Sequence, residues 1–261
     1  SYLDDQDILM EEVNADNPSE YRTEEGWKKF RTRQSIINVA DGTPKTLTLR
    51  WSDNGPILPL DMFELASVTP FGHVPALSFS ALSPADTTMS AVFTMIQAEN
   101  VTDAIAALEG YIAPSQNVTF IDRDSIGFKV IGAMPKRSIS HQTQGRMPAL
   151  GWVRNNQWNE RLPYSDNPEI INPETGIIGN TNNKTTDADF PNHVSFEWGD
   201  SQRINRLKRL MEMRKVHTRE SLIEAQLDTV SFTAQSLLPL IGKELWFTGE
   251  AGERGTLAWQ R

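Results

Sequence analysis

The chain has 261 residues, of which 38% are hydrophobic and 23% are charged, a composition typical of a globular protein able to bury one large core. Its net charge of −9 argues against nucleic-acid binding, because contact with phosphates requires clustered Lys and Arg. The lack of cysteine excludes disulfides, thiolate metal sites and a cysteine nucleophile, and no apolar run reaches the about 20 residues that span a bilayer.

The first residues read as the interior of a domain. The opening SYLDDQDILMEE lacks the features of a signal peptide, so we expect a processed chain or an excised fragment. A short strand is predicted at residues 8–13. The acidic cluster before it, Asp4-Asp5-Gln6-Asp7, allows two interpretations: a solvated acidic turn, or a site for a hard cation such as Ca²⁺ with oxygens from Asp4, Asp7 and the Gln6 carbonyl.

Residues 34–51 form the clearest predicted hairpin. Apolar residues lie on both sides of Asp41-Gly42, and glycine tolerates the positive φ that a tight turn needs. A second turn is predicted at Asp53-Asn54-Gly55-Pro56. Residues 68–82 favour β structure, although prolines interrupt them.

Helical spacing follows at residues 90–97 and again after Thr102, which we expect to cap a helix ending at Gly110. Residues 118–121 and 127–131 read as a pair of strands. The segment 138–186 is rich in Pro, Gly, Asn and Trp, so we expect it to be ordered by packing rather than by regular ladders.

The final part of the chain has helical periodicity. Thr218 is predicted to cap one long helix, whose apolar stripe runs from Ile223 to Ile241. The basic residues between Arg203 and Lys215 read as the wet face of an amphipathic helix. The chain therefore reads as a single α+β unit. Its parts are strands with short helices over 1–137, an irregular loop with an active-site strand over 138–200, and helices over 201–247.

One segment, from Asn172 to Arg203, carries a pattern suited to chemistry. It reads as a turn, a short apolar strand, consecutive amides at Asn182 and Asn183, a polar loop and a helix opening near Asp200. A fixed amide N–H lowers the barrier to amide hydrolysis by stabilising the oxyanion of the tetrahedral intermediate, and an arginine beside it can orient the amide. Considered without relatives, the Asn-Asn pair is more simply a β-turn.

Several motifs occur in the order found in the penicillin acylase family of N-terminal nucleophile hydrolases. Residues 4–7 match its D-D-x-D segment, and Asn54-Gly55-Pro56 resembles its H-G-P turn with Asn in place of His. Residues 114–137 match P-x-Q-N…D…G…G-x-x-P-x-R, and 172–204 match N-P-x-x-G…N-N…R-I. Gln226 and Asp228 match a later Q-x-D. The sequence thus resembles an internal fragment of the large chain of this family.

The resemblance implies a four-layer αββα sandwich with antiparallel sheets, and a self-processed amidohydrolase acting on a small acylated amide. Its nucleophile is an N-terminal serine in the sequence S-N-x-W, whereas Ser1 here is followed by Tyr2-Leu3-Asp4. We therefore expect the small chain and the remainder of the large chain to be missing partners, and the isolated fragment to be inactive. The family also implies a periplasmic or secreted location.

Carried over by position, the resemblance assigns Asn182 as the oxyanion donor and Arg203 as its neighbour. Gln116 falls at a position that lines the acyl pocket and is apolar in penicillin G acylases. For a structural calcium ion, the matching ligands are Asp4, Gln6 and Asp7, with the carbonyl of Gly145. A further family aspartate falls near His193 and is unmatched, and another ligand comes from the absent chain, so the calcium site is incomplete.

No organic cofactor is implied. The alternative function is a non-catalytic domain for binding or scaffolding in the cell envelope, because the sequence carries no nucleophile motif of its own.

Overall fold

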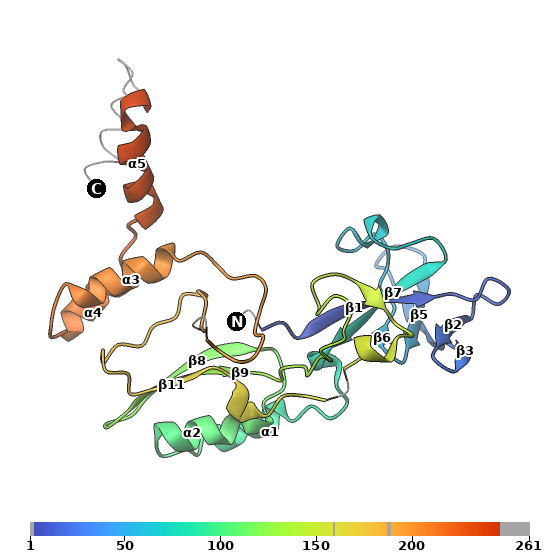
Figure 1. The fold of residues 1–261 in the computed structure, drawn as a ribbon, viewed down its shortest axis with the longest axis horizontal. Coiled ribbons are helices and arrows are strands. Elements are labelled where there is room, and N and C mark those ends of the chain that lie inside the picture. The colour runs from blue at the N-terminus through green and yellow to red at the C-terminus, as the bar shows by residue number, and fades with distance from the viewer. Residues whose placement is uncertain (1–2, 159, 187–188, 246–261) are drawn as a thin grey trace. The chain divides into compact units, whose positions relative to one another are not determined.

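The computed structural model describes residues 3–158, 160–186 and 189–245. It contains mixed helices and mainly antiparallel sheets, as expected (Figure 1). The chain divides into two compact units. Unit 1 comprises Ser1–Ile171 and Phe190–Glu197, and unit 2 comprises Asn172–Asp189 and Trp198–Arg261.

The first sheet of unit 1 has the strand order β10-β1-β7. The central strand β1 (Gln6–Glu12) is antiparallel to β7 (His73–Phe79) and parallel to the short β10 (Ala149–Leu150). The strand predicted at 8–13 is confirmed, although it begins earlier. Its consecutive residues Leu9 and Met10, which point to opposite faces of the sheet, are 1% and 3% exposed, so both faces are covered at this point.

Two hairpins follow β1 along the chain. β2 (Glu20–Thr23) pairs with β3 (Gly26–Lys29), and β4 (Arg31–Ile37) pairs with β5 (Lys45–Ser52), which also pairs with β6 (Gly55–Pro56). The predicted hairpin is confirmed. Gly55 has φ +133°, and a Cβ at this position would collide with the carbonyl oxygen of Leu77 on β7. Only glycine lets the backbone of this turn approach so closely.

The second main sheet of unit 1 has the order β11-β9-β8. Its strands are β8 (Gln116–Ile121), β9 (Ile126–Ile131) and β11 (Glu169–Ile171). Helices α1 (Thr88–Met95) and α2 (Val101–Ala107) lie along one side of it (Figure 1). The core between them contains Ala91, Leu108 and Ile131, with further apolar side chains packed around these residues.

The cap of α2 differs from the prediction. Asn100, and not Thr102, is the N-cap, because its Oδ1 accepts a hydrogen bond from the backbone N–H of Asp103 at 2.9 Å. The Asn100 side chain, two residues earlier, satisfies the free N–H of Asp103, and Thr102 lies inside the first turn. Short 3₁₀ helices occur at Leu65–Ser67, Ser80–Leu82, Leu108–Gly110, Arg154–Asn156 and Tyr164–Asp166.

Unit 2 contains α3 (Gln202–Glu212), α4 (Arg219–Gln226) and α5 (Phe232–Leu245). Thr218 caps α4 as predicted, and Ser221 completes a reciprocal capping box with it. The single long helix expected after Thr218 is interrupted between α4 and α5. Asp228 lies in this break and bonds to Arg206 of α3, a tertiary interaction that local periodicity does not report. In the described residues, no helix combines the length and the hydrophobicity that a bilayer crossing requires.

The strand predicted just before Asn182 and Asn183 is not found among the described residues. Residues 177–183 pair with no strand there. Two consecutive isoleucines favour extended backbone, but a strand also needs a neighbour to pair with. The nearest strand along the chain is β11, which ends at Ile171.

Glu11 is an unusual member of β1 because it is 0% exposed. Its Oε1 accepts from Asn54 Nδ2 at 2.8 Å, and its Oε2 has no hydrogen-bond partner among the described residues. Burial raises the pKa of the Glu11 carboxyl, against the opposing effect of hydrogen bonds from Ser52 and Asn54. The side-chain amide of Asn54 therefore hydrogen-bonds a buried carboxyl group.

We expect Glu11→Gln to raise the free energy of unfolding at neutral and alkaline pH. Because the folded-state pKa of Glu11 lies above its ordinary value of 4.5, its contribution to stability is full below that value and is lost as the pH rises through the folded-state pKa. The amide keeps the shape but carries no charge to desolvate. Urea unfolding across this pH range measures the difference.

Glu12→Gln is the matched control, because the neighbouring carboxylate is 33% exposed and pairs with Arg22. An equal effect of both substitutions, or no gain from Glu11→Gln above the ordinary pKa, would contradict the prediction.

Candidate functional site

The two residues predicted to act on the oxyanion are in contact. Arg203, on the first turn of α3, donates from Nη2 to Asn182 Oδ1 at 3.0 Å. Both belong to unit 2, and both side chains are exposed. The structure thus places the guanidinium against the amide, as the resemblance implied.

The amide is held in a turn whose backbone is bonded to side chains. Asn182 has φ 64°, a left-handed conformation that asparagine tolerates. Its backbone N–H donates to Asn180 Oδ1 at 3.0 Å, and the N–H of Thr181 donates to Asn183 Oδ1 at 3.0 Å. Residues 181 and 182 thus form a bend, and the contact between Asn182 and Arg203 that the resemblance implied is present.

The bond from Arg203 decides which end of the Asn182 amide is available. Guanidinium groups only donate, so the amide oxygen faces Arg203 and the Nδ2 group faces away from it. Among the described residues, Nδ2 of Asn182 has no hydrogen-bond partner. The arrangement offers an oriented, exposed N–H donor.

Helix α3 is anchored so that Arg203 has a defined position. Asp200 Oδ1 accepts from the backbone N–H of Gln202, the first residue of α3, at 3.0 Å. Ile204 is 7% exposed, and Arg206 forms a bidentate pair with Asp228 at 2.9 and 2.6 Å. The Arg206 guanidinium lowers the pKa of the Asp228 carboxyl through this hydrogen bond. Asp228 of the Q-x-D motif thus supports α3 from the break before α5.

A pocket of about 250 Å³ adjoins the same helix. Its walls include Arg203, Arg206, Leu207, Leu210 and Phe232. The basic residues of α3 were predicted to form a solvated face, whereas Arg206 is half-buried and ion-paired in this pocket.

Gln116, the predicted acyl-pocket residue, is the first residue of β8 in unit 1. It is exposed and lies opposite Ile131 of β9.

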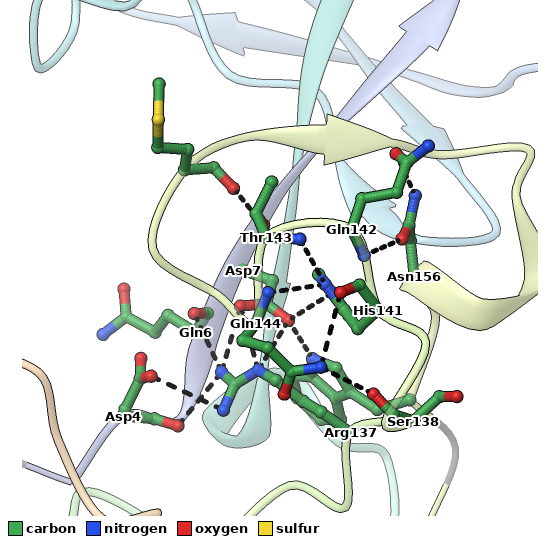
Figure 2. Close-up of polar contacts among 12 residues, drawn as sticks. Asp4, Gln6, Asp7, Arg137, Ser138, His141, Gln142, Thr143, Gln144 and Asn156 are labelled. Atoms are coloured by element: carbon green, nitrogen blue, oxygen red, sulfur yellow. Dashed lines mark hydrogen bonds and ion pairs between the residues drawn. The ribbon is translucent and has the colours of Figure 1, made fainter.

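The acidic cluster at the start of β1 surrounds an arginine (Figure 2). Arg137 donates from Nη2 to Asp7 Oδ1 at 3.0 Å, to the Asp4 carbonyl at 3.1 Å and to the Gln6 carbonyl at 3.4 Å. Its Nε donates to Asp7 Oδ2 at 3.0 Å, which makes the Asp7 pair bidentate. The side chains of Arg137 and Asp7 are 7% and 2% exposed, so this is a buried ion pair.

Two further groups face the same carboxylate. Trp158 donates from Nε1 to Asp7 Oδ2 at 2.7 Å, and His141 Nε2 lies 3.5 Å from that oxygen. His141 Nδ1 accepts from the backbone N–H groups of Thr143 and Gln144, so the proton of the neutral ring lies on Nε2, toward Asp7 (Figure 2). Burial lowers the pKa of His141, against the pull of the Asp7 charge.

The solvated-turn interpretation of this cluster is wrong. Asp5 and Asp7 are 5% and 3% exposed, and Ser80 donates to Asp5 Oδ2 at 3.0 Å. Burial raises the pKa of Asp5. Within the described residues, no group of three or more His, Cys, Asp or Glu side chains is placed to hold a metal ion.

Gly145, predicted to offer a carbonyl, packs its backbone against the ion pair. Its φ is +83°, and a Cβ there would lie 2.7 Å from Asp7 Oδ1 and 3.0 Å from Arg137 Cζ. Glycine is needed at this position because any side chain would collide with the ion pair that the backbone approaches. Arg137 belongs to a predicted motif without a predicted role, and no role was predicted for His141 or Trp158, because more than a hundred residues separate all three from Asp7.

Comparison with known proteins decides the relationship. The sequence matches the penicillin amidase family over residues 1–260.

The chain belongs to the penicillin amidase family.

It is 24% identical over 239 residues to the acyl-homoserine lactone acylase QuiP of Pseudomonas aeruginosa, covering 90% of this chain and 28% of that protein. It is 26% identical over 214 residues to penicillin G acylase of Escherichia coli, covering 81% of this chain and 24% of that protein. The chain therefore spans about a quarter of the length of these penicillin amidase relatives.

The structure is also similar to the thermostable penicillin G acylase from Alcaligenes faecalis, with a TM-score of 0.77 and 18% sequence identity. The match covers 100% of this chain and 46% of that chain. At this identity the likeness shows a shared fold. The family resemblance drawn from the motifs is confirmed.

Proposed function

We propose that this chain forms the oxyanion-binding part of an N-terminal nucleophile amidohydrolase that cleaves amide bonds of acylated substrates. The hydrogen bond from Arg203 to Asn182 carries the proposal. It fixes the amide oxygen and leaves Nδ2 directed outward as a donor. The membership of the penicillin amidase family supports amide hydrolysis as the chemistry.

In this mechanism Asn182 Nδ2 donates to the carbonyl oxygen of the scissile amide. The oxygen gains negative charge as the nucleophile adds, so the hydrogen bond strengthens in the transition state. Arg203 is a positioning residue that orients the amide and adds positive potential. Gln116 contributes a polar group to the acyl pocket, which disfavours a phenylacetyl group there.

The nucleophile is the hydroxyl of an N-terminal serine outside the motifs of this chain, since the sequence contains no S-N-x-W. Its own α-amino group takes the hydroxyl proton and returns it to the leaving amine, and water then hydrolyses the acyl-enzyme. The partners are the small chain and the remainder of the large chain. The enzyme works in the periplasm or outside the cell.

Two measurements test this proposal. The coding sequence upstream of the Ser1 codon is expected to contain S-N-x-W, whereas an unrelated domain or a start codon there would favour a binding or scaffold domain. The 261-residue chain alone is expected to give no turnover of chromogenic acyl anilides. Turnover by the pure chain that Asn182→Ala abolishes would show that the nucleophile lies within it.

A further inference from the structure

We propose that the cluster of Asp4, Gln6 and Asp7 does not bind a divalent cation in this chain, because the guanidinium of Arg137 is already bound to its oxygens. This inference concerns unit 1 and is independent of the oxyanion role of Asn182.

Asp4, Gln6 and Asp7, which would ligate calcium, each place an oxygen near this guanidinium. Nη2 of Arg137 is hydrogen-bonded to the carbonyls of Asp4 and Gln6 and to Asp7 Oδ1, at 3.1, 3.4 and 3.0 Å (Figure 2). Nη1 lies 3.5 Å from Asp4 Oδ2. Calcium requires about six to eight oxygens at about 2.3–2.6 Å. An ion among these oxygens would lie against a fixed positive charge, so the residues do not fit calcium while Arg137 is in place.

The remaining lone pairs of the carboxylates are also occupied. Asp7 Oδ2 accepts from Arg137 Nε at 3.0 Å and from Trp158 Nε1 at 2.7 Å. Asp4 Oδ2 lies 2.9 Å from His193 Nε2. His193 stands near the position where the resemblance expects another aspartate ligand. Here the imidazole of His193, which bonds to Asp4, therefore stands in place of a carboxylate that would bind calcium.

Little space is left around the pair. The Gly145 backbone lies so close that a Cβ would be 3.0 Å from both Arg137 Cζ and Arg137 Nε. The buried cation is covalently attached, so it cannot be removed by a chelator. It links β1 to residue 137 without any dependence on free calcium.

The first test uses terbium, which replaces calcium and emits when a nearby tryptophan is excited. Trp158 contacts Asp7 directly, so an ion bound there would give a sensitised signal. With chelator-treated chain we expect no saturable terbium emission from this cluster, and the same Tm in EDTA and in millimolar calcium. Emission that calcium displaces and Asp7→Asn abolishes would overturn the proposal, as would a saturable rise of Tm with calcium.

The second test removes the guanidinium. Arg137→Ala is expected to lower Tm in EDTA and to gain a calcium-dependent rise of Tm, because the carboxylate and carbonyl oxygens then lack a cation. Lys136→Ala is the matched control, since Lys136 is 57% exposed and pairs with Glu160 at the surface; it should stay insensitive to calcium.

No gain of calcium response in Arg137→Ala would overturn the idea that the guanidinium excludes the ion. If that variant does not fold, Arg137→Gln replaces it, and the terbium and Tm titrations of the unchanged chain still decide whether the cluster binds a divalent cation.

Discussion

Asn182→Ala is expected to lower kcat by about 10²–10³ in the enzyme that combines this chain with its serine-bearing partner, because one oxyanion donor is lost. KM should change little, since the donor acts mainly on charge that develops in the transition state. Steady-state hydrolysis of a chromogenic acyl amide gives both constants. A loss confined to KM would contradict the oxyanion role.

Asn183→Ala is the matched control for this experiment. The Asn183 amide is used inside the turn, where Oδ1 accepts from the Thr181 N–H and Nδ2 donates to the Lys184 carbonyl. It should change kcat far less than Asn182→Ala. Asn182→Asp separates positioning from donation, because a carboxylate keeps an acceptor for Arg203 but has no N–H to offer. Near-normal kcat in Asn182→Asp would show that Asn182 acts through Arg203 rather than on the substrate.

The second large effect concerns stability. Asp7→Ala is expected to reduce the free energy of unfolding by about 3–5 kcal/mol, because it leaves the buried Arg137 charge without its bidentate partner. The Arg137 side chain is 7% exposed and cannot turn to solvent without disrupting the cluster. Trp158 also loses its acceptor. Urea unfolding of the whole chain, followed by tryptophan fluorescence, measures the loss in free energy of unfolding.

An exposed ion pair provides the contrast. Asp53 and Lys28 are 2.7 Å apart, but their side chains are 60% and 55% exposed. Asp53→Ala should therefore cost about 0–1 kcal/mol, since water screens the pair and solvates both charges. Equal losses for the two alanine variants would show that burial does not strengthen the Asp7 interaction. Combining Asp7→Leu with Arg137→Met should recover much of the loss, because no unpaired charge is then buried.

Features that depend on neighbours in the chain were predictable. The β4–β5 hairpin follows from apolar alternation around Asp41-Gly42, and the start of α4 follows from Thr218, whose capping partner lies three residues later. Even such local signals can mislead. Asn100 and Thr102 are both residue types that can cap a helix. Which of them does so depends on the residue at which the backbone changes from extended to helical, and here that residue is Asn100.

The candidate site was predictable for a different reason. Asn182 and Arg203 were paired by resemblance, and the structure confirms their contact, although neither residue shows by itself which one it touches. The interruption between α4 and α5 could not be predicted, because the Arg206–Asp228 bond joins separate helical segments. A continuous apolar stripe is compatible with one helix or with two.

The family, the main hairpin and the order of the motifs can be deduced from the amino-acid sequence, because short spacings along the chain record them. The contacts of the acidic residues near the first strand became known only from the folded chain. Whether Asp7 is solvated, metal-bound or paired depends on which distant side chain folds against it, and here that side chain is Arg137. Burial and electrostatic pairing arise from three-dimensional packing, which residue types and their spacing do not specify.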